Sequence, residues 1–150
     1  MAHHSPYEWL VLGIFLVAVS GFADDPPAGH VVIDASDKAA IDQHMNRHVI
    51  VTGEIQRAAW SRSGKVLNIE FKNTQESKLI AVIFERKRKE FDEAFGGDVA
   101  KALSGAKVRL EGTIKPYGGR EEAKKGWPQI ILDQITQITI VEPPPATQPS

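Results

Sequence analysis

The chain of 150 residues contains no cysteine and has almost no excess of charge of either sign. Without cysteine it cannot form a disulfide, a thiolate metal site, a cysteine nucleophile or a lipid-modified cysteine. Its formal net charge is −1, from 18 Lys and Arg against 19 Asp and Glu. A protein that attracts polyanions through its overall charge carries a large positive excess. Any basic surface of this chain must therefore come from local segregation of charge.

The sequence also lacks a hydrophobic run long enough to cross a membrane. Trp9–Val19 is apolar and uncharged, but a membrane-spanning helix needs about 20 such residues. An apolar core of about 7–15 residues that ends in small residues is typical of a secretory signal peptide. We therefore expect residues 1–23 to be a signal peptide, cleaved after Ala23, and the mature chain to be periplasmic or secreted. Because no Lys or Arg precedes Trp9, an uncleaved N-terminal membrane anchor is the alternative.

Two segments without hydrophobic periodicity flank the part of the chain that is expected to fold. Residues 24–30 are a polar linker with two prolines. Residues 143–150 are a proline-rich tail, expected to be extended and solvated. The folded domain is therefore expected over residues 31–142, a length that suits one domain with its own core.

Two segments of this domain, Val49–Ile55 and Val108–Ile114, share the pattern V-x-(V/L)-x-G-x-I. Their apolar residues alternate, which is typical of strands with one buried face. A glycine in the middle of a strand weakens a flat sheet but permits a bend or a close approach of another backbone. The twin segments favour a small closed barrel. Two unrelated amphipathic strands are the alternative.

Three further strands follow from the same two-residue period. Residues 65–72 alternate, with Leu67, Ile69 and Phe71 expected to point inward. Residues 79–84 are apolar throughout, which is typical of a strand buried on both sides. Residues 129–140 form a long final strand or a strand with a kink.

Two helices interrupt the strands. Ser36 can cap a short helix over Asp37–Met45. In Arg88–Leu103 apolar residues recur every four positions, which predicts a helix that plugs the end of a barrel, and Gly96-Gly97 can break it. The resulting order of elements predicts an all-β fold, a five-stranded OB-type barrel with a helix between strands 3 and 4 and a short N-terminal helix.

Nearly all of residues 47–142 resembles a bacterial OB-fold family whose members are usually described as nucleic-acid-binding domains. The resemblance is carried by Val51–Ile55, Ser63–Phe71, Ala81–Phe84, Val108–Ile114 and Pro128–Leu132. These motifs are mostly core and turn residues. They therefore imply the fold more strongly than any particular ligand.

An OB barrel binds its ligands across its second and third strands and the two loops beside them. Both loops, expected here over residues 57–65 and 115–127, interleave aromatic rings with cations, which suits stacking of bases and contacts with phosphates. In the resembled family the second loop is shorter, and the charged insertion 121–126 either enlarges or obstructs the groove. The predicted ligand-binding residues are Arg57, Trp60, Arg62, Lys65, Asn68, Lys115, Tyr117, Arg120, Lys124, Lys125 and Trp127.

These residues also have an ordinary interpretation. Loop aromatics often cover the mouth of a barrel, and Lys and Arg are common on protein surfaces. The densest basic run, Arg86–Lys89, is followed by acidic residues on the same expected helix. We interpret it as a solvated, salt-bridged helix end.

No metal ligand and no cofactor is predicted. His44 and His48 are four residues apart, which suits a metal site if one helix contains both. However, His48 is expected to enter the first strand, so the histidines are interpreted as surface residues. His30 and Asp34 could complete a site only if the tertiary structure brought them there.

No catalytic residue is predicted either. The sequence has no Gly-rich phosphate loop and no G-x-S-x-G motif. It also lacks the Asp-Thr-Pro-Glu-like string that the secreted thermonucleases, which use an OB-like barrel, carry at their calcium site. The expected outward carboxylates Glu54, Glu70 and Glu111 lie on different strands without an evident cluster.

The sequence therefore predicts a non-enzymatic binding module, with single-stranded nucleic acid or another anionic polymer as its ligand. The alternative is a periplasmic or secreted ligand-binding or stress protein that recognises a small molecule, a cell-wall fragment or a protein partner. Export favours the alternative, because nucleic acid is scarce outside the cytoplasm. An interaction with envelope components is a further expectation of the same kind.

Overall fold

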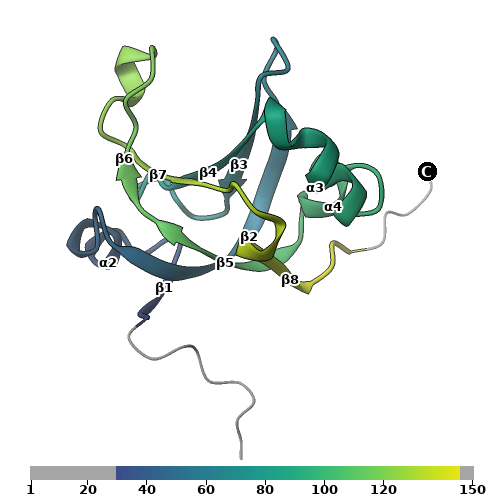
Figure 1. Cartoon of the computed structure of the whole chain (residues 1–150). Helices are drawn as coiled ribbons and strands as arrows, with labels where there is room; N and C mark the ends of the chain where they lie inside the picture. The colour runs from purple at the N-terminus through teal and green to yellow at the C-terminus, as the bar shows by residue number, and fades with distance from the viewer. Residues whose placement is uncertain (1–29, 146–150) are drawn as a thin grey trace, which may run out of the picture.

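The computed structural model describes residues 30–145, which form a strongly curved sheet with helices at its ends (Figure 1). The expected signal peptide, all but the last residue of the expected linker and the last five residues of the tail lie outside the described residues. Among the described helices, none has the length and apolar character that crossing a membrane would require.

The curved sheet has the strand order of an OB-type barrel. β2 pairs antiparallel with both β3 and β5, β3 pairs antiparallel with β4, and β4 pairs parallel with β7. β5 also pairs antiparallel with β8, so the hydrogen-bonded path is β6-β7-β4-β3-β2-β5-β8. The bounds are β2 His48–Trp60, β3 Val66–Phe71, β4 Ile80–Phe84, β5 Lys107–Thr113, β6 Lys115–Pro116, β7 Pro128–Ile131 and β8 Ile138–Glu142. The predicted fold class is confirmed. The expected closure of the barrel is not, because β6 and β8, at the two ends of this path, do not pair with each other.

The interior of the barrel is the alternating apolar face predicted from the sequence. Burial of one large apolar side chain stabilises the folded state by about 1.5–3 kcal/mol relative to its exposure to water. The inward residues of β2, β3 and β5 are at most 2% exposed: Val49, Val51, Ile55, Leu67, Ile69, Phe71, Val108 and Leu110, together with Ile114 just after β5. The two-residue period of the sequence therefore determines which face of each strand is buried.

The expected final strand is two separate strands, β7 next to one end of the hydrogen-bonded path and β8 at the other end. β7 and β8 are joined by a segment that includes the 3₁₀ helix η4 (Ile135–Gln137). Instead of a backbone ladder between β5 and β7, the side-chain amide of Gln137 donates to the carbonyls of Glu111, 3.0 Å away, and Ile131, 3.3 Å away. Its oxygen accepts from the backbone N–H groups of Asp133 and Gln134. One side chain thus bridges the seam of the barrel.

The two mid-strand glycines permit close approach of neighbouring elements. A Cβ atom at Gly112 would lie 2.7 Å from Ile130 Cγ2, and one at Gly53 would lie 3.0 Å from Ala35 Cβ and from Phe71 Cδ1. Neither glycine has a positive φ. The space for a neighbour, rather than an unusual backbone conformation, is therefore what requires glycine at both positions.

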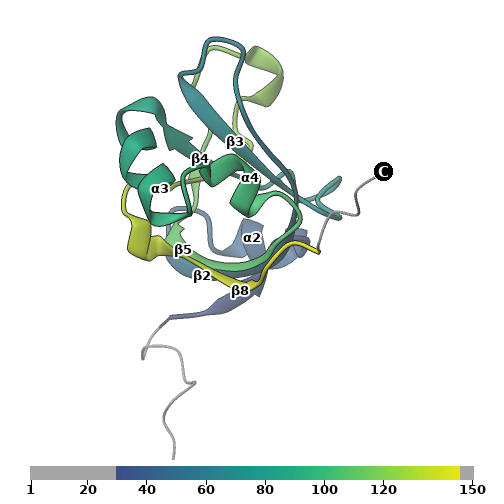
Figure 2. The same ribbon diagram turned by 90° about the vertical axis from the view of Figure 1, so that its right-hand side faces the viewer.

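The helices agree with the sequence in place but not in every boundary. The interrupted helix consists of α3 (Arg88–Ala94) and α4 (Val99–Leu103), separated by Gly96 and Gly97, whose φ angles are 78° and 104°. Figure 2 shows both helices at one end of the barrel. There Phe91, Val99 and Leu103 are fully buried in the core cluster, which confirms the predicted plug.

The N-terminal helix α2 is shorter than predicted and spans Lys38–Gln43. Its cap is Asp37, whose carboxylate accepts from the backbone N–H of Ala40 at 3.1 Å. The predicted cap, Ser36, instead donates its hydroxyl to Asp34. The prediction of Ser36 was therefore wrong by one residue, because the adjacent aspartate competes for the same N–H groups.

One strand was not expected from the sequence. β1 (Val32–Asp34) pairs parallel with β2, with Val32 opposite Ile50. Three residues are too few to show a two-residue period. This strand places the entry of the domain beside the start of β2.

Candidate functional site

The outward faces of four neighbouring strands form the floor of a groove. Arg57 and Ala59 of β2 lie opposite Glu70 and Asn68 of β3. Because side chains alternate between the two faces of a strand, the register continues this outward face across β4 and β7. The further floor residues are Val66, Ile80, Val82, Phe84, Gln129 and Ile131.

A β-bulge turns Arg57 toward this groove. The register of β2 against β3 shifts between Ile55 and Arg57. Ile55 and Ala58 are both buried although they are three residues apart. The extra residue therefore reverses the alternation, and the part of β2 that follows presents Arg57 and Ala59 outward.

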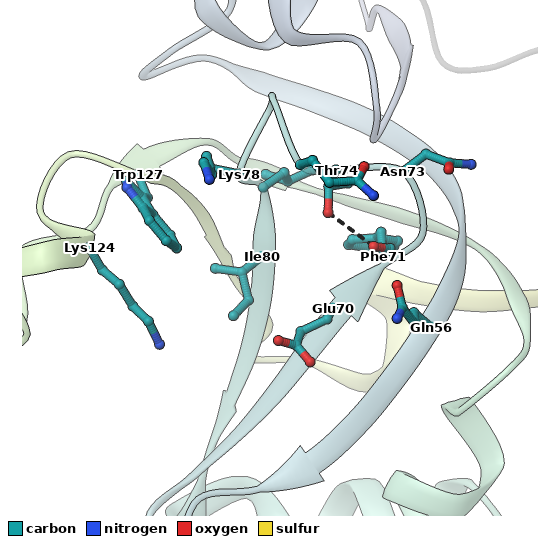
Figure 3. Close-up of a pocket in the computed structure, with 11 residues that line it drawn as sticks. Gln56, Glu70, Phe71, Asn73, Thr74, Lys78, Ile80, Lys124 and Trp127 are labelled. Atoms are coloured by element: carbon teal, nitrogen blue, oxygen red, sulfur yellow. Dashed lines mark hydrogen bonds between the residues drawn. The ribbon is translucent and has the colours of Figure 1, made fainter.

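Two protruding segments form the walls of the groove. Figures 1 and 2 both show the β2–β3 hairpin and the β6–β7 loop, which contains the 3₁₀ helix η3 (Glu122–Lys124), on the same side of the barrel. Three adjoining hollows of about 370, 320 and 250 Å³, all lined by Ile80 and Lys124, follow this side of the barrel. The second and third lie between the two walls, and the first lies beside the β3–β4 connection at residues 73–75. In Figure 3, Lys124 and Trp127 reach from the β6–β7 loop toward β4, facing Glu70 of β3.

Most of the predicted ligand-binding residues line this groove, although they come from two segments that are far apart in the sequence. The residues that line one or more of the three hollows are Arg57, Trp60, Arg62, Asn68, Tyr117, Lys124 and Trp127. Lys65, Arg120 and Lys125 do not line them. Lys115 lines a separate hollow beside His48 and Arg86.

The first predicted loop is shorter than the sequence indicated. Residues Arg57–Trp60 belong to β2, where Ala58, Ala59 and Trp60 pair with Ile69, Asn68 and Leu67 of β3. Only residues 61–65 form the hairpin connection. The extension of β2 to Trp60 was not predicted, because the bulge interrupts the alternation of apolar and polar residues by which a strand is recognised.

The two tryptophans each have a cation of the protein against the ring. The guanidinium carbon of Arg88 lies 4.5 Å from the centroid of Trp60, and Lys78 Nζ lies 5.0 Å from that of Trp127. Trp60 also packs against the core cluster. Trp60 therefore covers the barrel, as the ordinary interpretation predicted, and also borders the groove.

Tyr117 is held at the base of the β6–β7 loop. Its backbone N–H donates to the carbonyl of Trp127 at 2.8 Å, and its hydroxyl accepts from the N–H of Glu121 at 3.4 Å. A Cβ atom at Gly119 would lie 2.4 Å from this hydroxyl oxygen, so the ring lies over the glycine. These contacts fix the position of an aromatic ring at the edge of the groove.

The charges along the groove are mixed. In the β6–β7 loop, Lys124 pairs with Glu121 at 3.2 Å and Lys125 with Glu122 at 3.0 Å. The loop insertion therefore neutralises its own lysines while it forms one wall. On the opposite wall, Arg57 and Arg62 are exposed and make no ion pair with the residues between 30 and 145.

Three of the four residues of the basic run Arg86–Lys89, which extends into the first turn of α3, are salt-bridged, in agreement with the prediction. Arg86 pairs with Asp133 at 3.0 Å, Lys87 with Glu90 at 3.6 Å and Arg88 with Asp92 at 3.5 Å. These ion pairs neutralise the positive charges of Arg86, Lys87 and Arg88. The run is therefore a helix end rather than a free basic patch.

The apolar floor of the groove was not predicted from the sequence. Residues 79–84 were expected to be buried on both sides, but Ile80 and Phe84 are half-buried and line the hollow of about 320 Å³. Ile131 is 41% exposed beside them. A continuous apolar run does not distinguish a covered outer face from the floor of a cleft, so no sequence signal could have separated them.

Two carboxylates outside the groove are held in their charged form. The hydrogen bond from Lys72, with Nζ 2.8 Å from Oε2, lowers the pKa of Glu54. A hydrogen bond with His48, also 2.8 Å long, lowers the pKa of Glu111. His30 lies beside this second pair, whereas Nδ1 of His44 contacts the carbonyl of Ala40 instead.

Comparison with protein-family models and with curated protein sequences finds no match. Among solved structures, the chain is similar to an aspartyl-tRNA synthetase from Leishmania major Friedlin, with a TM-score of 0.54, 12% identity and 84% of this chain covered. It is similar also to the aspartyl-tRNA synthetase of Entamoeba histolytica, with a TM-score of 0.51, 13% identity and 86% covered. The chain spans about a quarter of each synthetase, 23% and 25%. Strand order, core and these likenesses together show an OB-type fold.

Proposed function

We propose that the chain is a non-enzymatic OB-fold module that binds single-stranded nucleic acid or another anionic polymer. The observation that carries the proposal is the place of the groove. It crosses β3 and β4 between the β2–β3 hairpin and the β6–β7 loop, where OB folds bind oligonucleotides. Both similar synthetases act, by their names, with tRNA, which supports a nucleic acid as the class of ligand.

The groove offers separate contacts for bases and for phosphates. The apolar floor around Val82 and the ring of Tyr117 suit the flat faces of bases. Arg57 and Arg62 on the hairpin side suit phosphates, because their guanidinium groups are exposed. Glu70 on the floor lowers the positive potential. The proposal therefore predicts modest affinity rather than tight binding.

We propose a binding role without catalysis because the candidate carboxylates are dispersed. Glu54 pairs with Lys72, and Glu111 with His48. Glu70 lines the groove without a second carboxylate on the neighbouring floor strands, and Glu121 of the groove wall is paired with Lys124. General acid–base or metal-assisted hydrolysis of a polymer usually needs two or more such groups around one point.

A second candidate is recognition of a small apolar ligand by an exported protein. The hollow of about 320 Å³ is lined by five aliphatic or phenyl side chains. Small-molecule sites are mostly apolar with a few polar groups. The five are Val66, Ile80, Val82, Phe84 and Ile131. Export itself is proposed from the signal-peptide pattern of residues 1–23. N-terminal sequencing of the protein from cell fractions tests it.

Titration at low salt decides between the two candidates. Fluorescence anisotropy with labelled single-stranded DNA, single-stranded RNA and heparin should show saturable binding that weakens steeply as salt is added. A thermal-shift panel of glycans, small amines and apolar ligands is run beside it. Absence of binding to all three polyanions, with a shift from one small ligand, would replace the first proposal with the second.

A further inference from the structure

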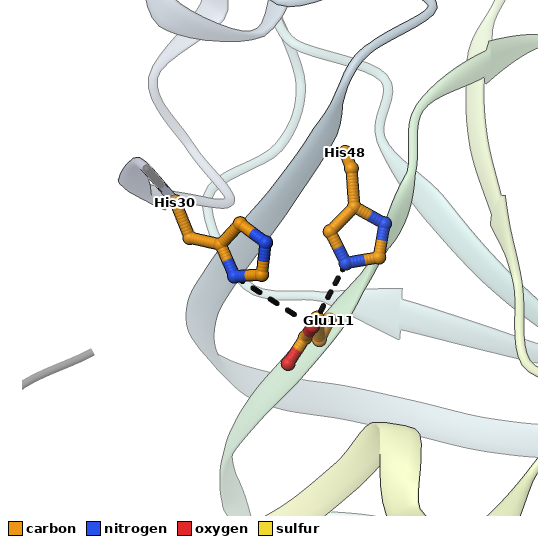
Figure 4. A group of neighbouring side chains, drawn as sticks. All are labelled: His30, His48 and Glu111. Carbon is orange, nitrogen blue, oxygen red and sulfur yellow. Dashed lines mark hydrogen bonds and ion pairs between the residues drawn. The ribbon is translucent and has the colours of Figure 1, made fainter. Parts of the chain in front are cut away.

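Three potential metal ligands meet on the outer face of neighbouring strands. β2 lies between β1 and β5, and Ile50 of β2 is opposite both Val32 and Glu111. His48 is two residues before Ile50, and His30 is two residues before Val32. The two-residue period therefore places His30, His48 and Glu111 on one face. Figure 4 shows the two rings turned toward the same carboxylate.

The distances between their ligand atoms are close to those of a metal site. His48 Nε2 lies 2.8 Å and His30 Nδ1 lies 3.8 Å from Glu111 Oε2, and the ligand atoms of all three residues lie within 4.8 Å of one another. A tetrahedral ion with bonds of about 2.0–2.1 Å holds its ligand atoms about 3.3 Å apart. Small side-chain rotations therefore suffice to admit an ion.

His30 supplies independent evidence for a missing partner. Its Nδ1 atom is buried and has no hydrogen-bond partner among the described residues. A buried polar atom without a partner is destabilising. The ion pair of His48 with Glu111 gives those two side chains a partner but leaves Nδ1 of His30 without one. A metal ion at the centre of the cluster would be a partner for this nitrogen.

We propose that His30, His48 and Glu111 bind one divalent transition-metal ion, with Zn²⁺ as the ion that their chemistry favours. Two imidazoles and one carboxylate form a ligand set found for zinc, and imidazole is preferred by zinc, copper and nickel over magnesium. The three side chains are 29%, 47% and 39% exposed. Water can therefore reach a fourth position.

The site has a structural consequence that is separate from the proposed function. None of its residues lines the groove between the hairpin and the β6–β7 loop. An ion bound here connects the segment before β1 to β2 and β5. Because metal binding to the folded state alone stabilises it, Zn²⁺ should raise the melting temperature of the protein.

The test uses the full chain with His3→Gln and His4→Gln, which removes the other neighbouring pair of histidines. Calorimetric titration with Zn²⁺ should show one ion per chain, with no comparable binding of Mg²⁺. His30→Ala and Glu111→Gln should each weaken Zn²⁺ binding by about tenfold or more, since even residues that only support a ligand contribute about 10–100-fold. His44→Gln is the matched control and should bind Zn²⁺ as the parent does.

The proposal is overturned if the parent binds no Zn²⁺ at one equivalent or if all three variants bind it equally. Circular dichroism identifies a variant that does not fold. In that case, NMR of the histidine rings in the parent is decisive. Zn²⁺ must shift the rings of His30 and His48 and leave that of His44 unchanged, and any other pattern refutes the site. Polyanion titration of the same protein tests the proposed function separately.

Discussion

The guanidinium group of Arg88 lies over the indole ring of Trp60, 4.5 Å from its centroid. Arg88 begins α3, and Trp60 ends β2. The contact joins the helix that closes the barrel to the hairpin that forms one wall of the groove. Since Trp60 also packs against the core, its replacement would change stability and ligand binding together. Tyr117 is therefore the cleaner test of stacking.

Replacement of Tyr117 by alanine should weaken binding of single-stranded DNA or RNA. Loss of one stacked base costs about 1–3 kcal/mol of binding free energy, which corresponds to about fivefold to 150-fold in affinity. Fluorescence anisotropy at constant salt measures the change. Tyr117→Phe keeps the ring and loses only the hydroxyl, so it should bind almost as the parent does. Equal loss in both variants would argue against stacking.

Replacement of Arg57 and Arg62 by glutamate should reduce both the affinity for polyanions and its dependence on salt. Each phosphate contact that is lost lowers the slope of log K against log salt by about one. The matched control is the double change of Lys89 and Lys101 to glutamate. Both lysines are exposed on α3 and α4 and line none of the three hollows. An equal effect of both double variants would indicate that net charge, rather than the groove, attracts the polymer.

Replacement of Gln137 by leucine should destabilise the barrel. The change leaves the carbonyl of Glu111 and the N–H groups of Asp133 and Gln134 without their partner. The free energy of unfolding should fall by about 1–3 kcal/mol. Urea denaturation measures it. Gln43→Leu, at an exposed position at the end of α2, should change it little.

Replacement of Gly112 by alanine should also destabilise the protein, by about 1–3 kcal/mol, because overpacking strains a well-packed site. The new Cβ atom would lie 2.7 Å from Ile130 Cγ2. At Gly118 no heavy atom lies within 4 Å of the same position. Gly118→Ala should therefore leave the melting temperature unchanged or raise it slightly. If both variants melt as the parent does, the seam between β5 and β7 is looser than the structure shows.

The ion pair of Glu54 with Lys72 predicts a pH dependence of stability. The hydrogen bond lowers the pKa of Glu54 below 4.5 in the folded protein. The pair therefore stabilises the fold above this pH and loses its effect as the pH falls through the lowered pKa. Glu54→Gln should be less stable than the parent at pH 7 and equal to it in strong acid. A difference that grows as the pH falls would have the wrong sign.

The order of elements could be predicted from the sequence because each signal was local. Alternation identified the buried faces of β2, β3 and β5, and Gly96-Gly97 marked the break between α3 and α4. β1 and the extension of β2 to Trp60 were missed. β1 has only three residues, too few to show alternation of apolar and polar residues. The extension of β2 follows a β-bulge, which reverses the alternation.

The sequence predicted most of the residues that line the candidate site, but not the contacts among them or the shape of the groove. Aromatic and basic residues in the two loops were visible along the chain. The pairing of Lys124 with Glu121 and the contact of Arg88 with Trp60 were not, because these depend on how loops and helices pack. The apolar floor at Ile80 and Phe84 also required the structure, since a continuous apolar run has the same appearance whether its outer face is covered or open.

The sequence by itself determined that this chain folds as an OB-type barrel, because period-two burial and glycine placement act within single segments. The tertiary structure alone decided what lies on the outside of that barrel. It brought His30, from the segment before β1, together with His48 of β2 and Glu111 of β5. It also formed one groove from two loops that are more than fifty residues apart in the sequence. These arrangements depend on strand register and loop packing, which no single segment of the sequence specifies.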